Sequence, residues 1–172
     1  ANLFHSSTAA GGVLDVQQTI TGLPAGYYEV SADMSSTSDA TNNHVYATSG
    51  GVTKTSPVFS LIGGAWTAWE TLTADKVRVG EDGTLTIGAA STTDGTQYKG
   101  WFCVTNFQLK YYGTEYDMSA DVQNKVAEVS DAIAMLTLAG DKAAAEEKLR
   151  TITDGAAADY DKVSELAALL AE

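Results

Sequence analysis

Three segments of the chain hold residue types that recognise sugars. Residues 35–43 are all Ser, Thr, Asp, Ala or Asn, residues 63–69 place two tryptophans three apart beside a glycine pair, and residues 92–100 mix aromatic, amide and charged side chains. Sugars are bound by flat aromatic faces and by planar polar groups on their hydroxyls, and loops on a rigid scaffold can supply both. We therefore expect a carbohydrate site in which Trp66 and Tyr98 stack on the sugar and these side chains bind its hydroxyls: Asp39, Asn42, Asn43, His44 and Lys99. Each has a structural alternative, because aromatic rings also fill cores and paired asparagines are common in turns.

Catalysis is less well supported than binding. An enzyme needs a nucleophile or a proton-transfer group held by an orienting partner. The chain has two histidines, His5 and His44, and no Gly-x-Ser-x-Gly motif. Paired carboxylates roughly 5 to 9 Å apart could cleave a glycosidic bond, but no pattern brings two of the candidates together: Asp33, Asp39, Glu70 and Asp94. We expect no enzymatic activity and no catalytic residue.

Composition argues against several partners. The net charge of −12 is unsuited to nucleic acid and to anionic membranes, which need a basic face. No apolar run approaches the roughly 20 residues that span a bilayer, so no membrane insertion is expected. Cys103 is the one cysteine, and neither metal-ligand spacings nor an Asp-x-Asp-x-Asp loop occurs, so we expect no metal and no cofactor. We expect Cys103 to be a buried, unreactive thiol.

The composition changes sharply near Gly113. Residues 1–116 hold both prolines, all three tryptophans and all four phenylalanines, whereas residues 117–172 have none of these and are rich in Ala, Asp and Glu. Such a change indicates a boundary between two architectures. We predict a β-sandwich over 1–116 and a three-helix segment over 117–172, with strand before Tyr112 and helix after Ser119.

The first half alternates apolar and polar residues, as half-buried β-strands do. This pattern covers residues 14–20 and 28–34, and further strands are expected at 44–48 and 101–112. Residues 77–79 lead through Gly80-Glu81-Asp82-Gly83 into residues 85–87, which predicts a hairpin with Gly83 at positive φ. Short strands with glycine-rich turns predict an antiparallel sandwich or jelly roll. The same alternation predicts that Trp69 and Trp101 lie in its core.

The second half repeats its apolar residues at helical spacing. Ser119 is the expected N-cap of a first helix and Gly140 its expected C-cap, a second helix begins at Asp141, and Asp154-Gly155 ends it. Three successive amphipathic helices should pack into a small bundle. The residues expected on its inner faces are Val122, Val126, Val129, Ile133, Leu136, Ala145, Leu149, Ile152, Val163, Leu166, Ala167 and Leu170.

Three stretches of the first half resemble, in order, turn-and-strand units of galactose-binding-like jelly rolls of the carbohydrate-binding-module type. They are residues 17–30, which contain Leu-Pro-Ala-Gly-Tyr-Tyr, residues 82–88, Asp-Gly-Thr-Leu-Thr-Ile-Gly, and residues 100–113, which contain Val-Thr-Asn-Phe-Gln-Leu. Such domains occur, often beside helical modules, in secreted or cell-surface glycan-handling proteins of gut bacteria. The resemblance implies a non-catalytic, glycan-binding accessory module of a larger multidomain protein.

Two departures from that pattern keep a second function open. Related domains open with a further strand, and because few residues precede Val13 we expect that strand to be missing. They also often carry an acidic residue before the Asn-Phe pair, where this chain has Thr105. The alternative is therefore a structural spacer or adhesion module with a degenerate ligand site, since one fold hosts many functions.

Overall fold

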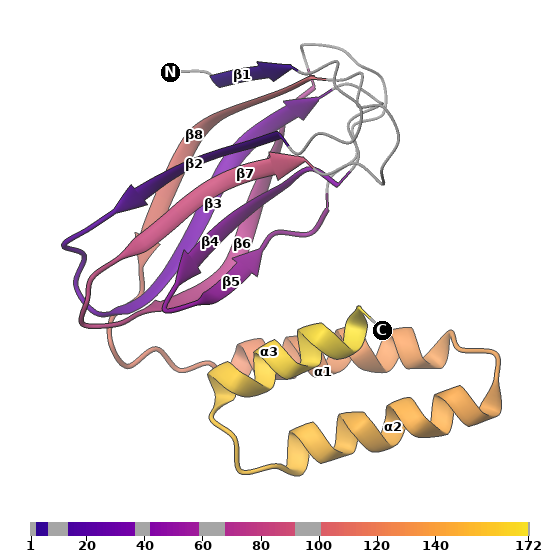
Figure 1. The fold of residues 1–172 in the computed structure, drawn as a ribbon. Helices are drawn as coiled ribbons and strands as arrows, with labels where there is room; N and C mark the ends of the chain where they lie inside the picture. The colour runs from indigo at the N-terminus through magenta and orange to yellow at the C-terminus, as the bar shows by residue number, and fades with distance from the viewer. Residues whose placement is uncertain (1–2, 7–13, 37–41, 59–67, 92–100, 172) are drawn as a thin grey trace. The chain divides into compact units, whose positions relative to one another are not determined.

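The computed structural model describes residues 3–6, 14–36, 42–58, 68–91 and 101–171 (Figure 1). Contacts divide the chain into two compact units, Ala1–Tyr116 and Asp117–Glu172. In the described residues the first unit consists of strands and the second of helices. No described helix is long and apolar enough to cross a membrane.

The first unit is an antiparallel β-sandwich whose two sheets form the two layers visible in Figure 1. One four-stranded sheet has the order β1-β8-β3-β6 and the other the order β2-β7-β4-β5. Among consecutive strands of the described chain, only β4 and β5 pair with each other. The strands are β1 (Leu3–Ser6), β2 (Leu14–Ile20), β3 (Gly26–Ser36), β4 (His44–Ser49), β5 (Val52–Thr55), β6 (Glu70–Val79), β7 (Leu85–Ser91) and β8 (Trp101–Tyr111).

The predicted alternation sets which side chains form the core of the sandwich. Tyr28, Val30, Ala32 and Met34 of β3 are each at most 3% exposed, whereas the residues between them are half-buried. They pack with apolar residues of β4, β6, β7 and β8 to form the core. Burying one such side chain contributes about 1.5–3 kcal/mol, so this layer supplies most of the stability of the unit. Cys103 also lies buried, as expected, and burial raises the pKa of its thiol.

The predicted hairpin around Gly83 is wrong, although the turn itself is present. β6 belongs to one sheet and β7 to the other, so residues 80–83 carry the chain between sheets. Gly83 has φ +60°, as expected, and its carbonyl accepts a hydrogen bond from the Leu23 N–H at 3.1 Å. A Cβ at Gly83 would lie 2.7 Å from the Leu23 carbonyl oxygen. The two sheet-crossing turns are therefore in direct contact.

Two further expectations for this unit are corrected. The opening strand is present, because β1 pairs with β8 in the register Leu3 to Val104 and Ser6 to Trp101. Trp69 is 41% exposed rather than in the core. Ala68 packs against the core instead, and Trp69 is the exposed residue just before β6 begins. Trp101 lies in β8, and its side chain is outside the described residues.

A cluster of aromatic and charged side chains holds the end of the first unit. Lys76 lies 4.9 Å from the ring centroid of Tyr112 and 5.0 Å from that of Tyr116. The Tyr112 hydroxyl donates to Glu29 at 3.0 Å, and Lys76 forms an ion pair with the same carboxylate at 3.7 Å. These contacts fasten residues 112–116 to the sheet before the first helix begins.

The second unit is a three-helix segment with its own small core. Its helices are α1 (Ser119–Ala134), α2 (Ala139–Asp154) and α3 (Asp159–Leu170). The centre of the core is Val129, Ile133 and Leu166, and partly buried apolar residues surround it: Val122, Val126, Ala145, Leu149, Ile152 and Leu169. The last strand, β8, ends at Tyr111, and the first helix, α1, begins at Ser119.

The ends of these helices differ from the expected caps. Ser119 is the first helical residue instead of the N-cap, which is Met118 and has no capping side-chain bond. Asp117, one residue before the N-cap, accepts a hydrogen bond from the Ser119 N–H at 2.9 Å. α1 ends at Ala134, which leaves Leu136 beyond the helix and 42% exposed, and Gly140 lies in the first turn of α2. Leu170 is 37% exposed because Leu169 packs inward in its place.

Candidate functional site

The residues predicted to bind sugar divide into described and undescribed positions. Asn42, Asn43 and His44 lie at the start of β4, whereas Asp39, Trp66, Tyr98 and Lys99 lie outside the described residues. The described strand ends next to these segments meet at one end of the sandwich, because His44 pairs with Ala90, Met34 with Glu70 and Ser36 with Phe102. We call this the His44 end, defined by Ser36, His44, Glu70, Ser91 and Trp101.

Buried polar side chains hold the His44 end together. Asn43 and Ser36 flank residues 37–41, both are fully buried, and the Asn43 amide donates to the Ser36 hydroxyl at 3.1 Å. A buried polar group is costly unless it is hydrogen-bonded, so this bond ties β3 to β4 across the two sheets. The described position of Asn43 thus gives it a positioning role, with its side chain turned to Ser36 instead of to the surface.

His44 is half-buried and has a defined hydrogen-bonding state. Its Nδ1 lies 2.8 Å from the Asn42 carbonyl oxygen, and Asn42 has φ +58°. A carbonyl only accepts hydrogen bonds, so Nδ1 carries the proton in the neutral ring and Nε2 is left as an acceptor. A sugar hydroxyl can donate to such a nitrogen. Asn42 contributes here through its backbone, in a left-handed conformation that asparagine tolerates.

The outer face of the β2-β7-β4-β5 sheet next to His44 carries an aromatic patch that the sequence did not predict. Tyr46 is half-buried, and its hydroxyl crosses β7 to donate to the Asp15 carboxylate at 2.8 Å and to the Gln17 amide oxygen at 3.2 Å. The ring passes over Gly88, where an added Cβ would collide with Cζ of Tyr46. The ring of His44 stands beside it, with centroids 6.2 Å apart. We call these residues with Ala90 the Tyr46 patch.

The electrostatics of the Tyr46 patch are set by its one carboxylate. Burial, followed by the hydrogen bond to Asp15 and its charge, raises the pKa of the Tyr46 hydroxyl well above its usual value. The hydroxyl therefore stays protonated and acts as a donor. The only lysine or arginine on these four strands is Lys54, which is buried on the other face of the sheet. The patch is thus polar, aromatic and mildly acidic.

A second polar cluster lies on the other sheet. Asp33 accepts from the Thr71 hydroxyl at 2.6 Å and from the Asn106 amide at 2.9 Å, one bond to each carboxylate oxygen. Asn106 has φ +54°, and the pairing of β3 with β8 shifts register there, as at a β-bulge. Thr105 pairs with Asp33, so a carboxylate lies directly opposite Thr105 on the neighbouring strand. Among the described residues no group of three or more side chains is placed to hold a metal.

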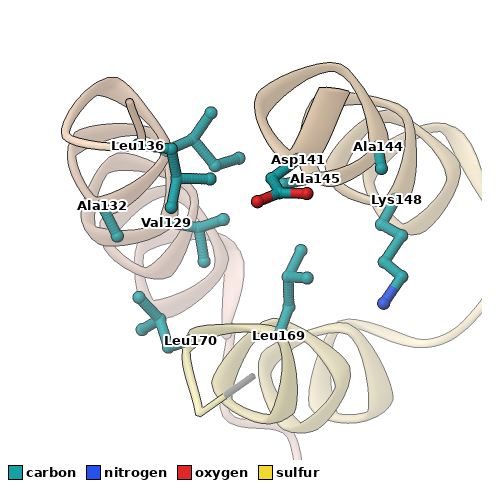
Figure 2. A pocket seen from close by; sticks show the side chains of 10 residues that line it. Val129, Ala132, Leu136, Asp141, Ala144, Ala145, Lys148, Leu169 and Leu170 are labelled. Atoms are coloured by element: carbon teal, nitrogen blue, oxygen red, sulfur yellow. The ribbon is translucent and has the colours of Figure 1, made fainter. Parts of the chain in front are cut away.

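The three-helix unit contains a groove of different chemistry, shown in Figure 2. It has a volume of about 390 Å³ and is lined mostly by apolar side chains of the three helices, including Ala144, Leu169 and Leu170, together with Leu136 from the segment between α1 and α2. Asp141 and Lys148 of α2 supply its charged groups. The lining has few polar groups, so it is unlike a sugar site.

Comparisons with known proteins find solved structures that are similar to this chain at low identity. No protein-family model and no curated protein sequence matches the chain. The C-terminal domain of EclA, a sugar-binding protein, is similar at 17% identity and a TM-score of 0.45, covering 64% of this chain and 77% of that one. The CBM35 module of Cellvibrio japonicus Abf62 is similar at 20% identity and a TM-score of 0.37, covering 64% and 78%. The C-terminal CBM6 module of LamC, a marine laminarinase of Zobellia galactanivorans, has 17% identity and a TM-score of 0.28, covering 62% and 100%.

Proposed function

We propose that residues 1–116 form a non-catalytic carbohydrate-binding module whose site is at the His44 end of the sandwich. The similar structures include sugar-binding modules, and the proposal for this chain rests on its own residues. Trp66 and Tyr98 stack on the sugar, and Asp39, His44 and Lys99 bind its hydroxyls. Asn43 and the backbone of Asn42 position His44 without touching the sugar themselves.

The main support for this proposal is a pair of hydrogen bonds made by residues on either side of residues 37–41. The Asn43–Ser36 bond joins these flanks, and the bond from His44 to the Asn42 carbonyl fixes the ring. A site whose polar groups are held before the ligand arrives loses less entropy on binding. His44 Nε2 then presents an acceptor to a hydroxyl at a defined position.

Binding fits two of the described carboxylates, Asp33 and Asp15, better than hydrolysis does. Asp33 has both of its oxygens engaged by neutral donors, and Asp15 accepts from Tyr46. A general acid for glycoside hydrolysis instead needs a carboxyl that is free to pass its proton to the substrate. We therefore propose a module that holds a glycan without cleaving it.

The same proposal implies what kind of protein the module belongs to and where that protein acts. A glycan-binding accessory module serves a secreted or cell-surface protein of several domains, as the resemblance implies. The helical unit has a core of its own, made by Val129, Ile133 and Leu166. We propose that it acts as a spacer between the sandwich and a neighbouring domain.

A panel of oligosaccharides measured by calorimetry and by NMR chemical-shift changes tests the function. We expect weak binding, near the millimolar level, because a shallow site buries little of a well-hydrated ligand. His44→Ala, Trp66→Ala and Tyr98→Ala should each weaken it several-fold, while Glu81→Ala, in an exposed turn next to the far ends of β6 and β7, should not. A panel with no binder, or binding that all three variants leave unchanged, would refute the site.

A further inference from the structure

We infer that the Tyr46 patch is a second sugar-binding subsite, and that its ligand is a neutral sugar residue. This inference rests on the proposed function but concerns the adjoining face of a sheet, which shares His44 with the site at the end of the sandwich. The patch consists of Asp15, Gln17, His44, Tyr46, Gly88 and Ala90.

The strand β7 is built to let an aromatic ring lie flat on the sheet. Gly88 and Ala90 alternate with the core residues Ile87 and Ala89, so they are its outward positions. Glycine and alanine are disfavoured in strands, where larger side chains normally cover the pleat. Here the small residues leave room, and both are buried although they lie on the outer face. A Cβ at position 88 would collide with the ring of Tyr46.

The ring is also fixed in direction. Its hydroxyl is bonded to Asp15 and Gln17 on β2, at 2.8 and 3.2 Å, while its backbone belongs to β4. It is therefore held at both ends across β7, and one face lies over Gly88. The opposite face is the flat apolar surface on which a sugar stacks its C–H groups. His44, tilted by 48° to this ring, borders that surface.

The polar groups around the ring select the class of sugar. Asp15, Gln17 and His44 offer acceptors, together with an amide donor, to hydroxyls at the rim of a stacked ring. Lys54, the only lysine or arginine on the four strands, is buried, so no cation on these strands balances a sugar carboxylate or sulfate. An anionic sugar would face Asp15 and a chain of net charge −12. A neutral hexose or pentose needs no balancing cation and is not repelled by Asp15 or by the negative charge of the chain.

A purely structural role for Tyr46 is the competing explanation, since an aromatic ring can simply shield a strand glycine. Gly88→Ala separates the two explanations. It supplies the missing Cβ and pushes the ring off the strand, while the tyrosine remains. The atoms it would meet are at the far end of a movable side chain, so the fold should survive.

The experiment measures binding of neutral hexasaccharides of glucose, galactose, mannose and xylose, and of a galacturonate hexasaccharide, to the full chain. Tyr46→Ala and Gly88→Ala should weaken binding of the preferred neutral probe about tenfold, the effect of losing one aromatic contact. Tyr46→Phe keeps the ring but not its anchor and should weaken binding less. Thr48→Ala, two residues along β4 on the same face, is the matched control and should bind normally. Circular dichroism confirms that each variant is folded.

The outcomes separate this inference from the proposed function. Wild-type affinity in both Tyr46→Ala and Gly88→Ala, together with loss in Trp66→Ala, overturns the subsite and leaves the site at the His44 end standing. Failure of the wild type to bind any neutral probe refutes the proposed function and the subsite with it. Galacturonate binding that depends on Tyr46 overturns the assignment to neutral sugars.

Discussion

Replacing Val129 by aspartate should unfold the helical unit and leave the sandwich intact. Val129 is 1% exposed and packs with Ile133 and Leu166 at the centre of a core that contains few fully buried residues. The substitution removes about 1.5–3 kcal/mol of apolar burial. It also places a carboxylate without a partner in that core, and the total loss reaches about 3–5 kcal/mol.

That loss is comparable with the whole stability of the unit. At roughly 0.05–0.15 kcal/mol per residue, a unit spanning residues 117–172 has about 3–8 kcal/mol to lose. α2 adds no fully buried residue, so nothing in it compensates. Val129→Ala, which removes two methyl groups at about 0.8 kcal/mol each, should lower the melting temperature without unfolding the unit.

The assay is thermal unfolding followed by the helical circular dichroism signal, to which the sandwich contributes little. Ala127→Asp adds the same charge at an exposed position of α1. It controls for the lower helix propensity of aspartate, which destabilises a helix by less than about 0.7 kcal/mol. We expect the helical signal to disappear in Val129→Asp and to persist in Ala127→Asp. Equal melting temperatures for Val129→Asp and the wild type would show that this face of α1 is not packed.

Three further predictions address single residues. Cys103 should react slowly with a thiol reagent in the native protein and quickly in denaturant, because burial raises its thiol pKa; fast native labelling would contradict this. Asp117 accepts the first backbone N–H of α1, which lowers the pKa of its carboxyl. The ionised carboxyl of Asp117 therefore stabilises α1 above about pH 4, the usual aspartate range, and this stabilisation is lost as the pH falls through the lowered pKa. Asp117→Asn should remove this acid-side loss from a plot of stability against pH. Gly83→Ala should cost about 1–3 kcal/mol in denaturant unfolding, because φ is positive and its Cβ meets the Leu23 carbonyl, whereas Gly80→Ala should cost much less.

Local patterns in the sequence account for most of the elements but not for their partners. The alternation over 28–34 identifies β3 and its buried face, because that signal is contained within one strand. The turn at Gly83 is equally local, yet it does not reveal which sheet the next strand joins. That choice depends on pairing β7 with β2 and β4, whose residues lie far away in the chain. A hairpin is the natural inference from a short turn, and here it is wrong.

The candidate site also combines residues that local sequence patterns identify with residues whose role depends on long-range strand pairing. His44 stands out in the sequence because it follows a polar segment, and it does lie at a strand end beside that segment. Tyr46 does not stand out, because its importance depends on Gly88 in another strand and on Asp15 in a third. One signal in the sequence could have identified it. Gly88 and Ala90 occupy alternate positions of β7, so the outer face of this strand carries unusually small side chains. Only the register shows what lies over it.

The pairing pattern of the sandwich also sets the order in which the two units should fold. Among the strands that the structure describes, only β4 pairs with the next one along the chain, so almost every described sheet contact must close a long loop first. Such topologies fold in milliseconds to seconds, whereas small helical units fold in microseconds to milliseconds. During synthesis, β3 cannot complete its sheet until β8 has emerged, and the helices follow directly after β8. The helical unit should therefore become native while the sandwich is still searching for its register.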